Sequence, residues 1–316
     1  MSDVSYSENE FDEAPAILIF SDSISGENAA RGAVDVIGGR IAFCGAIGDI
    51  SGRLKQQVAM AAILIDITRD HGHVLDRALD QLDALARHEG VAIIVSAPIA
   101  LIDTVSARLG EGDAIILCDP DPNDRVAALS LVLSEKVMMF ADVTTEIDSQ
   151  RLRRLADEVS RIARARSLIS SNSIATGMSG QVNDVQLAFK AEPMALEFAP
   201  DVPSAPDIRR LIRLRRQRDN FFDAALFADP AWDMLLDLMA ARIEQDRVAV
   251  SSLCIAASVP PTTALRWIKA MTDHGLFERH ADPDDGRRIF IRLSEAAAAA
   301  MGRYFTAAKK SGGWVI

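Results

Sequence analysis

The chain contains few cysteines and lacks any long apolar run. Its three cysteines, Cys44, Cys118 and Cys254, lie far apart in 316 residues and form no CxxC pair, so neither a disulfide framework nor a zinc site is indicated, and we expect all three to be buried. No stretch approaches the roughly 18 to 20 consecutive apolar residues of a membrane helix, and the polar start MSDVSYSENEFDEA is not a signal peptide. These absences predict a cytoplasmic protein without membrane contact.

Motifs that mark common enzymes are absent as well. No GxGxxG or GxxxxGKS/T run follows the first apolar stretch, and no GxSxG sequence occurs. Asp70, His71 and His73 share one loop, but a metal site normally shows more ligands at fixed spacing, so we expect a solvated loop. The sequence therefore assigns no catalytic residue, no cofactor and no metal, and it predicts a protein that is not an enzyme.

The net charge of −11 argues by itself against binding to nucleic acid, but its distribution does not. Residues 1–140 hold 10 Lys and Arg against 22 Asp and Glu, whereas residues 201–316 hold 17 against 15. The acidity belongs to the first part of the chain, and the last part remains compatible with DNA.

From residue 15 to residue 140, short apolar runs alternate with helical patterns. Each run is followed by an amphipathic segment, which is typical of a parallel sheet with helices on both faces. Five such units predict a doubly wound α/β domain of the flavodoxin-like type. The apolar runs cover residues 16–20, 40–47, 61–67, 91–98 and 113–120.

Polar residues stand at the ends of these predicted strands. They are Ser21 and Asp22 after the first, Asp66 in the third, Ser96 in the fourth and Asp119 in the fifth. The series resembles the receiver domain of two-component response regulators, in which two acidic residues, an Asp phosphoacceptor, a Ser or Thr and a Lys hold those positions. The resemblance implies an input domain that a kinase or another signalling protein contacts.

Asp119 stands where receivers have the Lys that holds phosphoryl oxygens. The change removes a cation and adds a negative charge beside Asp22 and Asp66, so phosphate would be repelled unless a divalent metal bound this acidic cluster. We therefore expect a pseudo-receiver that signals by other means or only dimerises. Phosphorylation of Asp66 stays open, and so does a plain role of its carboxylate in capping the next turn.

Three segments outside the folded parts have patterns of their own. Residues 1–14 are polar and are expected to form a disordered tail. In residues 146–170 apolar side chains recur at heptad-like spacing from Leu152 onward, which favours a dimerising helix and also fits a helix packed on its own chain. Residues 171–206 are rich in Ser, Gly and Pro and are expected to be a linker.

An arginine-rich helix opens the last predicted domain, residues 207–316. Six arginines fall in ten positions from Arg209 to Arg218. Such a helix can lay Arg213 and Arg216 along DNA phosphates. It can equally pair with the acidic first domain, which would then mask it until a signal releases it.

Residues 248–294 predict a short strand, two helices joined by a tight turn, and a β-hairpin. Ser251 or Ser252 can cap the first helix, the two prolines at 260–261 preset the start of the second, and Gly275 ends it. In the second helix one side should pack and the opposite side is polar. The packing side is formed by Ala264, Trp267, Ile268 and Met271.

The hairpin completes a pattern that resembles the winged helix-turn-helix repressors of the MarR type. That family has a D-P-x-D-x-R run in its wing; here the run is D-P-D-D-G-R from Asp282 to Arg287, followed by a strand from Ile289 to Ser294, and Gly286 stands where the family often has a second Arg. The resemblance implies a dimer that reads double-stranded DNA with the second helix and the wing. The DNA-contacting residues are then Ser252, Thr262, Thr263, Arg266, Lys269, Arg287 and Arg288, with Arg213 and Arg216 added from the upstream helix.

Taken together, these patterns predict a nucleoid-associated, homodimeric transcriptional regulator whose winged helix is controlled by a pseudo-receiver domain. The alternative is a signalling adaptor that uses both domains for contacts with other proteins, because a fold does not by itself fix a function.

Overall fold

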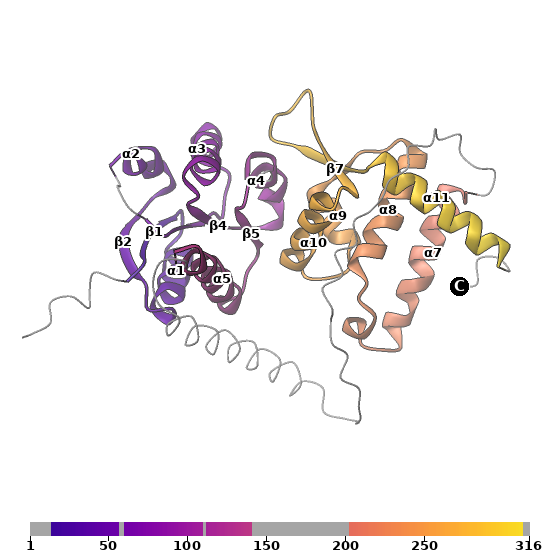
Figure 1. Ribbon diagram of the computed structural model, residues 1–316, viewed down its shortest axis with the longest axis horizontal. Helices are drawn as coiled ribbons and strands as arrows, with labels where there is room; N and C mark the ends of the chain where they lie inside the picture. The colour runs from indigo at the N-terminus through magenta and orange to yellow at the C-terminus, as the bar shows by residue number, and fades with distance from the viewer. Residues whose placement is uncertain (1–13, 57–59, 110–111, 141–201, 312–316) are drawn as a thin grey trace, which may run out of the picture. The chain divides into compact units, whose positions relative to one another are not determined.

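A computed structural model describes residues 14–56, 60–109, 112–140 and 202–311. The predicted tail and dimerising helix and nearly all of the predicted linker lie outside the described residues. The described residues up to Leu129 and those from residue 202 onward belong to one compact unit. This unit contains an α/β domain and a winged helix domain, as the sequence predicts (Figure 1).

A five-stranded parallel sheet forms the centre of the α/β domain. Its strands are β1 Ala16–Ser21, β2 Arg40–Gly45, β3 Ala62–Asp66, β4 Ala92–Ala97 and β5 Ile115–Cys118. Its helices are α1 Ile24–Val36, α2 Ile50–Leu54, α3 His73–Glu89, α4 Ile102–Leu109 and α5 Pro122–Phe140, with 3₁₀ turns at Ile47–Asp49 and Ile99–Leu101. The strand order β2-β1-β3-β4-β5 is that of a flavodoxin-like, doubly wound fold.

Helices cover both faces of this sheet. Figure 1 shows α1 and α5 on one face and α2, α3 and α4 on the other. The central strands are therefore buried on both sides, which explains why they read as continuous apolar runs; Ile17, Leu18, Ile19 and Phe20 of β1 are all 0% exposed. The carboxyl ends of the parallel strands meet at one edge, where the polar residues singled out in the sequence lie.

The winged helix domain combines helices with a small antiparallel sheet of order β6-β8-β7. Its elements are α7 Ala205–Gln217, 3₁₀ turns at Arg218–Asn220 and Ala224–Phe227, α8 Pro230–Glu244, β6 Val248–Ala249, α9 Val250–Ala256, α10 Pro261–Asp273, β7 Phe277–Ala281, β8 Ile289–Leu293 and α11 Glu295–Lys310. In the part of the chain that the structure describes, no helix has both the length and the hydropathy of a membrane span.

The start and the end of α10 lie where the sequence predicts, and side-chain caps begin α8 and α11. Asp229 caps α8 by accepting a hydrogen bond from Trp232 N at 3.3 Å. Helix α10 begins at Pro261 and is followed by Gly275, whose φ of 69° lies in the left-handed region that favours glycine. Ser294, at the end of the predicted hairpin strand, caps α11. These local signals fix the helix pair and the hairpin in the order that the sequence predicts.

Candidate nucleic-acid interface

The second helix of the helix-turn-helix, α10, presents a polar side as predicted. Thr263, Arg266 and Lys269 are exposed along it, and Ile268 on the opposite side is buried. The prediction that Trp267 packs is wrong in part, because 39% of this residue is exposed. Exposed Thr, Arg and Lys side chains on one helix can hydrogen-bond base edges and phosphates in a major groove.

Thr262 does not face solvent, contrary to its predicted place on the polar side. It is 7% exposed, and its Oγ1 accepts from Cys118 N at 3.0 Å and donates to Cys118 O at 3.1 Å. Because β5 is an edge strand, its outer backbone groups have no neighbouring strand, and the Thr262 hydroxyl satisfies two of them. In this arrangement Thr262 is unable to contact DNA.

The first helix of the pair, α9, is capped by a residue from the α/β domain. Its N-cap position is Ala249, which makes no side-chain cap bond, so the prediction of a cap by Ser251 or Ser252 is wrong. Asp103 of α4 instead accepts from Ser251 N at 2.9 Å and from Ser251 Oγ at 2.6 Å. An acidic group is favourable there because the amino end of a helix carries partial positive charge. Ser252 remains exposed on α9.

The hairpin between β7 and β8 carries one exposed arginine and one engaged arginine. Arg288 has a side chain 64% exposed and lies 3.4 Å from Asp285. Arg287 binds Asp76 through Nε at 2.9 Å and Asp70 through Nη1 at 2.7 Å. These hydrogen bonds raise the pKa of Arg287, and the one from Arg287 lowers the pKa of Asp70. Arg287 is therefore charged, but its donors are occupied.

Most arginines of the helix α7 region bind groups of the winged helix domain itself. Arg209 binds Asp237 at 2.9 Å and Glu244 at 2.7 Å, and Arg215 lies 3.3 Å from Asp233. Burial raises the pKa of Asp233, and the nearby charge of Arg215 opposes that rise. The arginine-rich helix is thus largely a structural element that pairs with α8, a use that the sequence interpretation did not consider.

Only part of the predicted arginine surface remains open to a ligand. Arg216 donates to the carbonyl oxygen of Ala256, and Arg218 to that of Phe227 at 2.9 Å. Arg213 is exposed and has no hydrogen-bond or ion-pair partner among the described residues. Of the two upstream arginines predicted to meet DNA, Arg213 is therefore the more available.

In the α/β domain, Asp22 accepts hydrogen bonds from the loop that follows β3. Its carboxylate accepts from Thr68 N, Thr68 Oγ1 and Arg69 N at 2.8 to 3.2 Å and lies 2.8 Å from His71 Nε2. Burial raises the pKa of Asp22, but the hydrogen bonds from His71, Thr68 and Arg69 outweigh it, so that the pKa is lowered overall. Asp22 therefore fixes the loop.

Asp66 forms an ion pair with Arg125, a residue that the resemblance to receivers does not predict at this site. Arg125 Nη2, from α5, lies 2.7 Å from Asp66 Oδ2, and the two side chains are 12% and 8% exposed. The expectation that Asp119 leaves this edge without a cation is therefore wrong. Asp119 itself contacts the 3₁₀ turn that follows β4, where it accepts a hydrogen bond from Ile99 N at 3.3 Å.

A cavity of about 490 Å³ lies at the same edge of the sheet. Asp66, Ser96, Asp119 and Arg125 all line it, and Asp22 does not. In the described residues no group of three or more His, Cys, Asp or Glu is placed to hold a metal ion. The acidic cluster expected at this edge is thus divided between a loop contact and an ion pair.

Two of the three cysteines are buried as predicted, and Cys44 is only partly buried. Burial, with the negative charge of Asp119 nearby, raises the pKa of Cys118 to about 12. Burial also raises the pKa of Cys254 to about 12. Both thiols are therefore protonated and unreactive at neutral pH.

Three residues that bind site residues or their neighbours are not predicted by the sequence. Arg125 has a weak signal, because it is a basic residue one helical turn after the loop that ends β5. Asp103 and Asp76 carry no signal at all, since each is one of many acidic residues on the helices of the first domain. Only the distances of the fold identify their partners.

Comparison with known families gives a match in the last part of the chain. Residues 241–297 match the family described as "Winged helix DNA-binding domain". The match covers α9, α10 and the hairpin, and it therefore includes the exposed polar side of α10. Comparison with curated protein sequences gives no match.

Two solved structures show partial similarity to this chain. One is the MepR–DNA complex of S. aureus, with 16% identity over 34% of this chain and 79% of MepR at a TM-score of 0.23. Another is the response regulator RcsB of Salmonella typhimurium, with 13% identity over 78% of this chain and 100% of RcsB at a TM-score of 0.30. These TM-scores are too low to assign a fold or a function to the whole chain.

Proposed function

Starting from the winged helix match, we propose that this chain is a transcriptional regulator that binds double-stranded DNA. The observation that supports this most strongly is the exposed polar side of α10, with Thr263, Arg266 and Lys269, inside the matched segment. Arg288 on the hairpin can reach a neighbouring minor groove or its phosphates. Two chains related by a two-fold axis can bind the two halves of a palindromic DNA site. The proposed active form is therefore a MarR-type homodimer.

We propose that the α/β domain acts as a pseudo-receiver, which controls the DNA-contacting surface formed by α10 and the hairpin. Thr262 and Arg287, both predicted DNA contacts, bind Cys118, Asp70 and Asp76 of that domain instead. A side chain whose donors are taken by carboxylates is not available to phosphates or bases. The proposed control is therefore competition between the α/β domain and DNA for the same side chains.

The proposed control does not use phosphorylation of Asp66. Its carboxylate is close to fully buried in an ion pair with Arg125, and Asp22, the acidic residue expected to help hold a metal, is engaged elsewhere. We expect no phosphoryl adduct in intact mass spectra after incubation with acetyl phosphate and Mg²⁺. An adduct that disappears in Asp66→Asn would restore Asp66 as a phosphoacceptor.

The DNA-binding proposal is tested by fluorescence anisotropy on genomic fragments at several salt concentrations. We expect salt-sensitive binding with two chains per duplex, and Arg266→Ala should weaken it by about 1 to 3 kcal/mol and relax the preference at one base pair. Arg303→Ala, an exposed arginine on α11, is the matched control. No binding at any salt concentration, combined with stoichiometric capture of a protein partner, would favour the signalling adaptor.

A further inference from the structure

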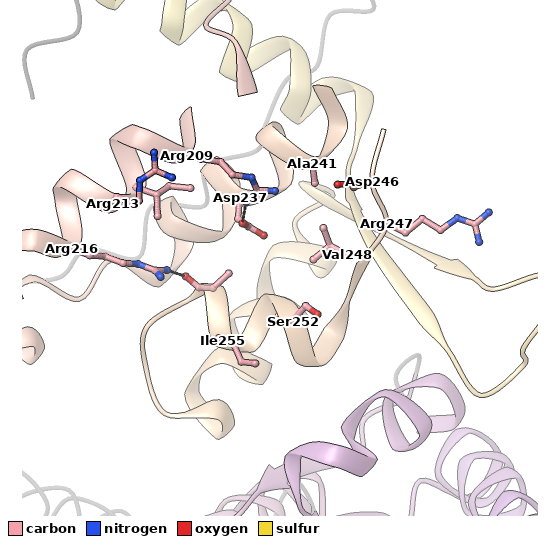
Figure 2. A pocket seen from close by; sticks show the side chains of 12 residues that line it. Arg209, Arg213, Arg216, Asp237, Ala241, Asp246, Arg247, Val248, Ser252 and Ile255 are labelled. Carbon is pink, nitrogen blue, oxygen red and sulfur yellow. Dashed lines mark hydrogen bonds and ion pairs between the residues drawn. The ribbon is translucent and has the colours of Figure 1, made fainter. Parts of the chain in front are cut away.

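The winged helix domain has a recess of its own, which is separate from the exposed polar side of α10. It has a volume of about 420 Å³ and lies among α7, α8, the start of β6 and α9. Figure 2 shows Arg209, Arg213 and Arg216 extending from one helix along one side of it, with Ser252 and Ile255 of α9 on another side. The three arginines are four and three residues apart, so they lie on one face of α7.

The arginines around the recess differ in what they already bind. Arg209 is neutralised by Asp237 and Glu244, at 2.9 and 2.7 Å. Arg247 extends away from the other arginines in Figure 2 and lies 3.6 Å from Asp282 of the hairpin. The guanidinium groups of Arg213 and Arg216 make no ion pair in the described residues, although the charge of Arg216 also acts on the nearby carboxylate of Asp233.

Arg216 has an incomplete set of partners. One of its terminal nitrogens donates to the carbonyl oxygen of Ala256, but its Nε is shielded from solvent and has no hydrogen-bond partner in the described part of the chain. That Nε is out of reach of a bound ligand, but Arg216 is only half-buried and lines the recess, so the accessible part of its guanidinium group can donate to an oxyanion there. Arg213, one turn earlier, is exposed and can donate to the same anion.

The apolar part of the wall strengthens such an interaction, while two carboxylates, those of Asp246 and of Asp237, which is paired with Arg209, also line the recess. Ile212, Val248 and Ala241 line it and are nearly buried, with exposed fractions of 2 to 8%. Charges beside an apolar wall are screened less than charges in open water. Ser252, exposed at the rim, offers a hydroxyl donor.

We propose that this recess is an oxyanion site that takes a phosphate group, with Arg213 and Arg216 as its charged donors and Ser252 as a neutral one. Planar guanidinium groups suit phosphate because they donate two parallel hydrogen bonds. The phosphate belongs either to the DNA backbone, which the first helix of a helix-turn-helix crosses, or to a free phosphorylated small molecule. With a DNA phosphate as occupant the inference rests on the proposed function, whereas inorganic phosphate tests the site itself in the absence of DNA.

The first experiment uses the full chain and inorganic phosphate in the absence of DNA. Thermal unfolding and isothermal titration calorimetry are measured in phosphate and in chloride at equal ionic strength. We expect saturable stabilisation by phosphate, with the Kd raised about tenfold in Arg213→Gln, the loss of one charge-assisted pair. Arg210→Gln is the control, since Arg210 is exposed on the same helix but does not line the recess.

Two results would overturn the site. One is the absence of any phosphate effect beyond that of chloride, and the other is equal phosphate binding by the Arg213 and Arg210 variants. Arg213→Gln is preferred to Arg216→Gln because Arg213 makes no structural hydrogen bond whose loss could unfold the domain.

A second arm identifies the source of the phosphate. If Arg213→Gln also lowers the slope of log K against log salt for DNA by about one, relative to Arg210→Gln, the occupant is a backbone phosphate. If the DNA slope is unchanged while phosphate binding is lost, the occupant is a free phosphorylated molecule. Both results support the oxyanion site, and neither depends on how the α/β domain controls DNA binding.

Discussion

The carboxylate of Asp22 has a different role from the one that its position after β1 predicts. Asp22 follows β1 where receivers have metal-binding acids, yet it receives three hydrogen bonds from the loop after β3 and a fourth contact from His71. Its side chain is 2% exposed. A buried carboxylate with several donors stabilises the loop only while it is ionised.

This predicts that Asp22→Asn lowers the free energy of unfolding by about 1 to 3 kcal/mol at pH 7. Since the pKa of Asp22 is lowered in the folded state, its contribution is complete above the ordinary Asp pKa of about 4 and is lost as the pH falls through the lowered pKa. Urea unfolding between pH 2 and pH 7 measures both effects. Asp35→Asn, an exposed acid on α1, should change neither, and a constant difference across this pH range would contradict the assignment.

Helix α7 shows how an arginine-rich element becomes part of a domain core. One of its faces buries Ile208 and Ile212, and its arginines reach acids on or next to α8. Asp233 on α8 is 7% exposed, and burial raises its pKa. Ionisation of Asp233 therefore opposes folding, and Arg215 offsets that cost.

We expect Arg215→Met to destabilise the protein by about 1 to 3 kcal/mol at pH 7, because it removes the cation that hydrogen-bonds to the buried Asp233 carboxylate and leaves only the charge of Arg216 to offset its ionisation. At low pH Asp233 is protonated, so the loss should become smaller as the pH falls through its raised pKa. Thermal unfolding at pH 4 and pH 7 tests this sign. Arg210→Met, on the exposed side of the same helix, is the control, and a larger loss at pH 4 would refute the role of Arg215.

Within the compact unit, contacts with the α/β domain engage part of the proposed DNA-contacting surface. Arg287 lies between Asp70 and Asp76, whose side chains are 44% and 12% exposed. The pair with Asp70 is screened by water and contributes little, whereas the pair with Asp76 is better shielded. Ser251 and Thr262 add hydrogen bonds to Asp103 and to β5.

Replacing both acids, Asp70→Asn with Asp76→Asn, should therefore free Arg287 and tighten DNA binding about three- to tenfold. Anisotropy titrations at fixed salt measure this change, and Arg287→Ala in the same background should abolish the gain. Asp80→Asn is the matched control, because Asp80 binds Arg108 within the α/β domain. Unchanged or weaker binding in the double variant would show that these contacts do not restrain the hairpin.

Features that depend on near neighbours in the chain can be predicted from the sequence, whereas contacts between distant residues cannot. The five strands, the turn prolines at 260–261 and Gly275 follow from periodicity and backbone preference, which depend on near neighbours in the chain. The sequence by itself therefore determined the two fold classes and the polar side of α10. It did not locate Arg125, Asp103 or Asp76, because any of the acidic and basic residues nearby would satisfy the same pattern.

Only the tertiary structure decided which charged groups are free. Thr262 and Arg287 fit the pattern of DNA contacts, but their donors bind Cys118, Asp70 and Asp76, residues more than 140 positions away in the chain. The physical reason is that a helical pattern fixes which side of a helix a residue faces, whereas a hydrogen bond requires a partner atom within about 3 Å. That distance is set by the packing of the fold and is not encoded in the spacing of the residues.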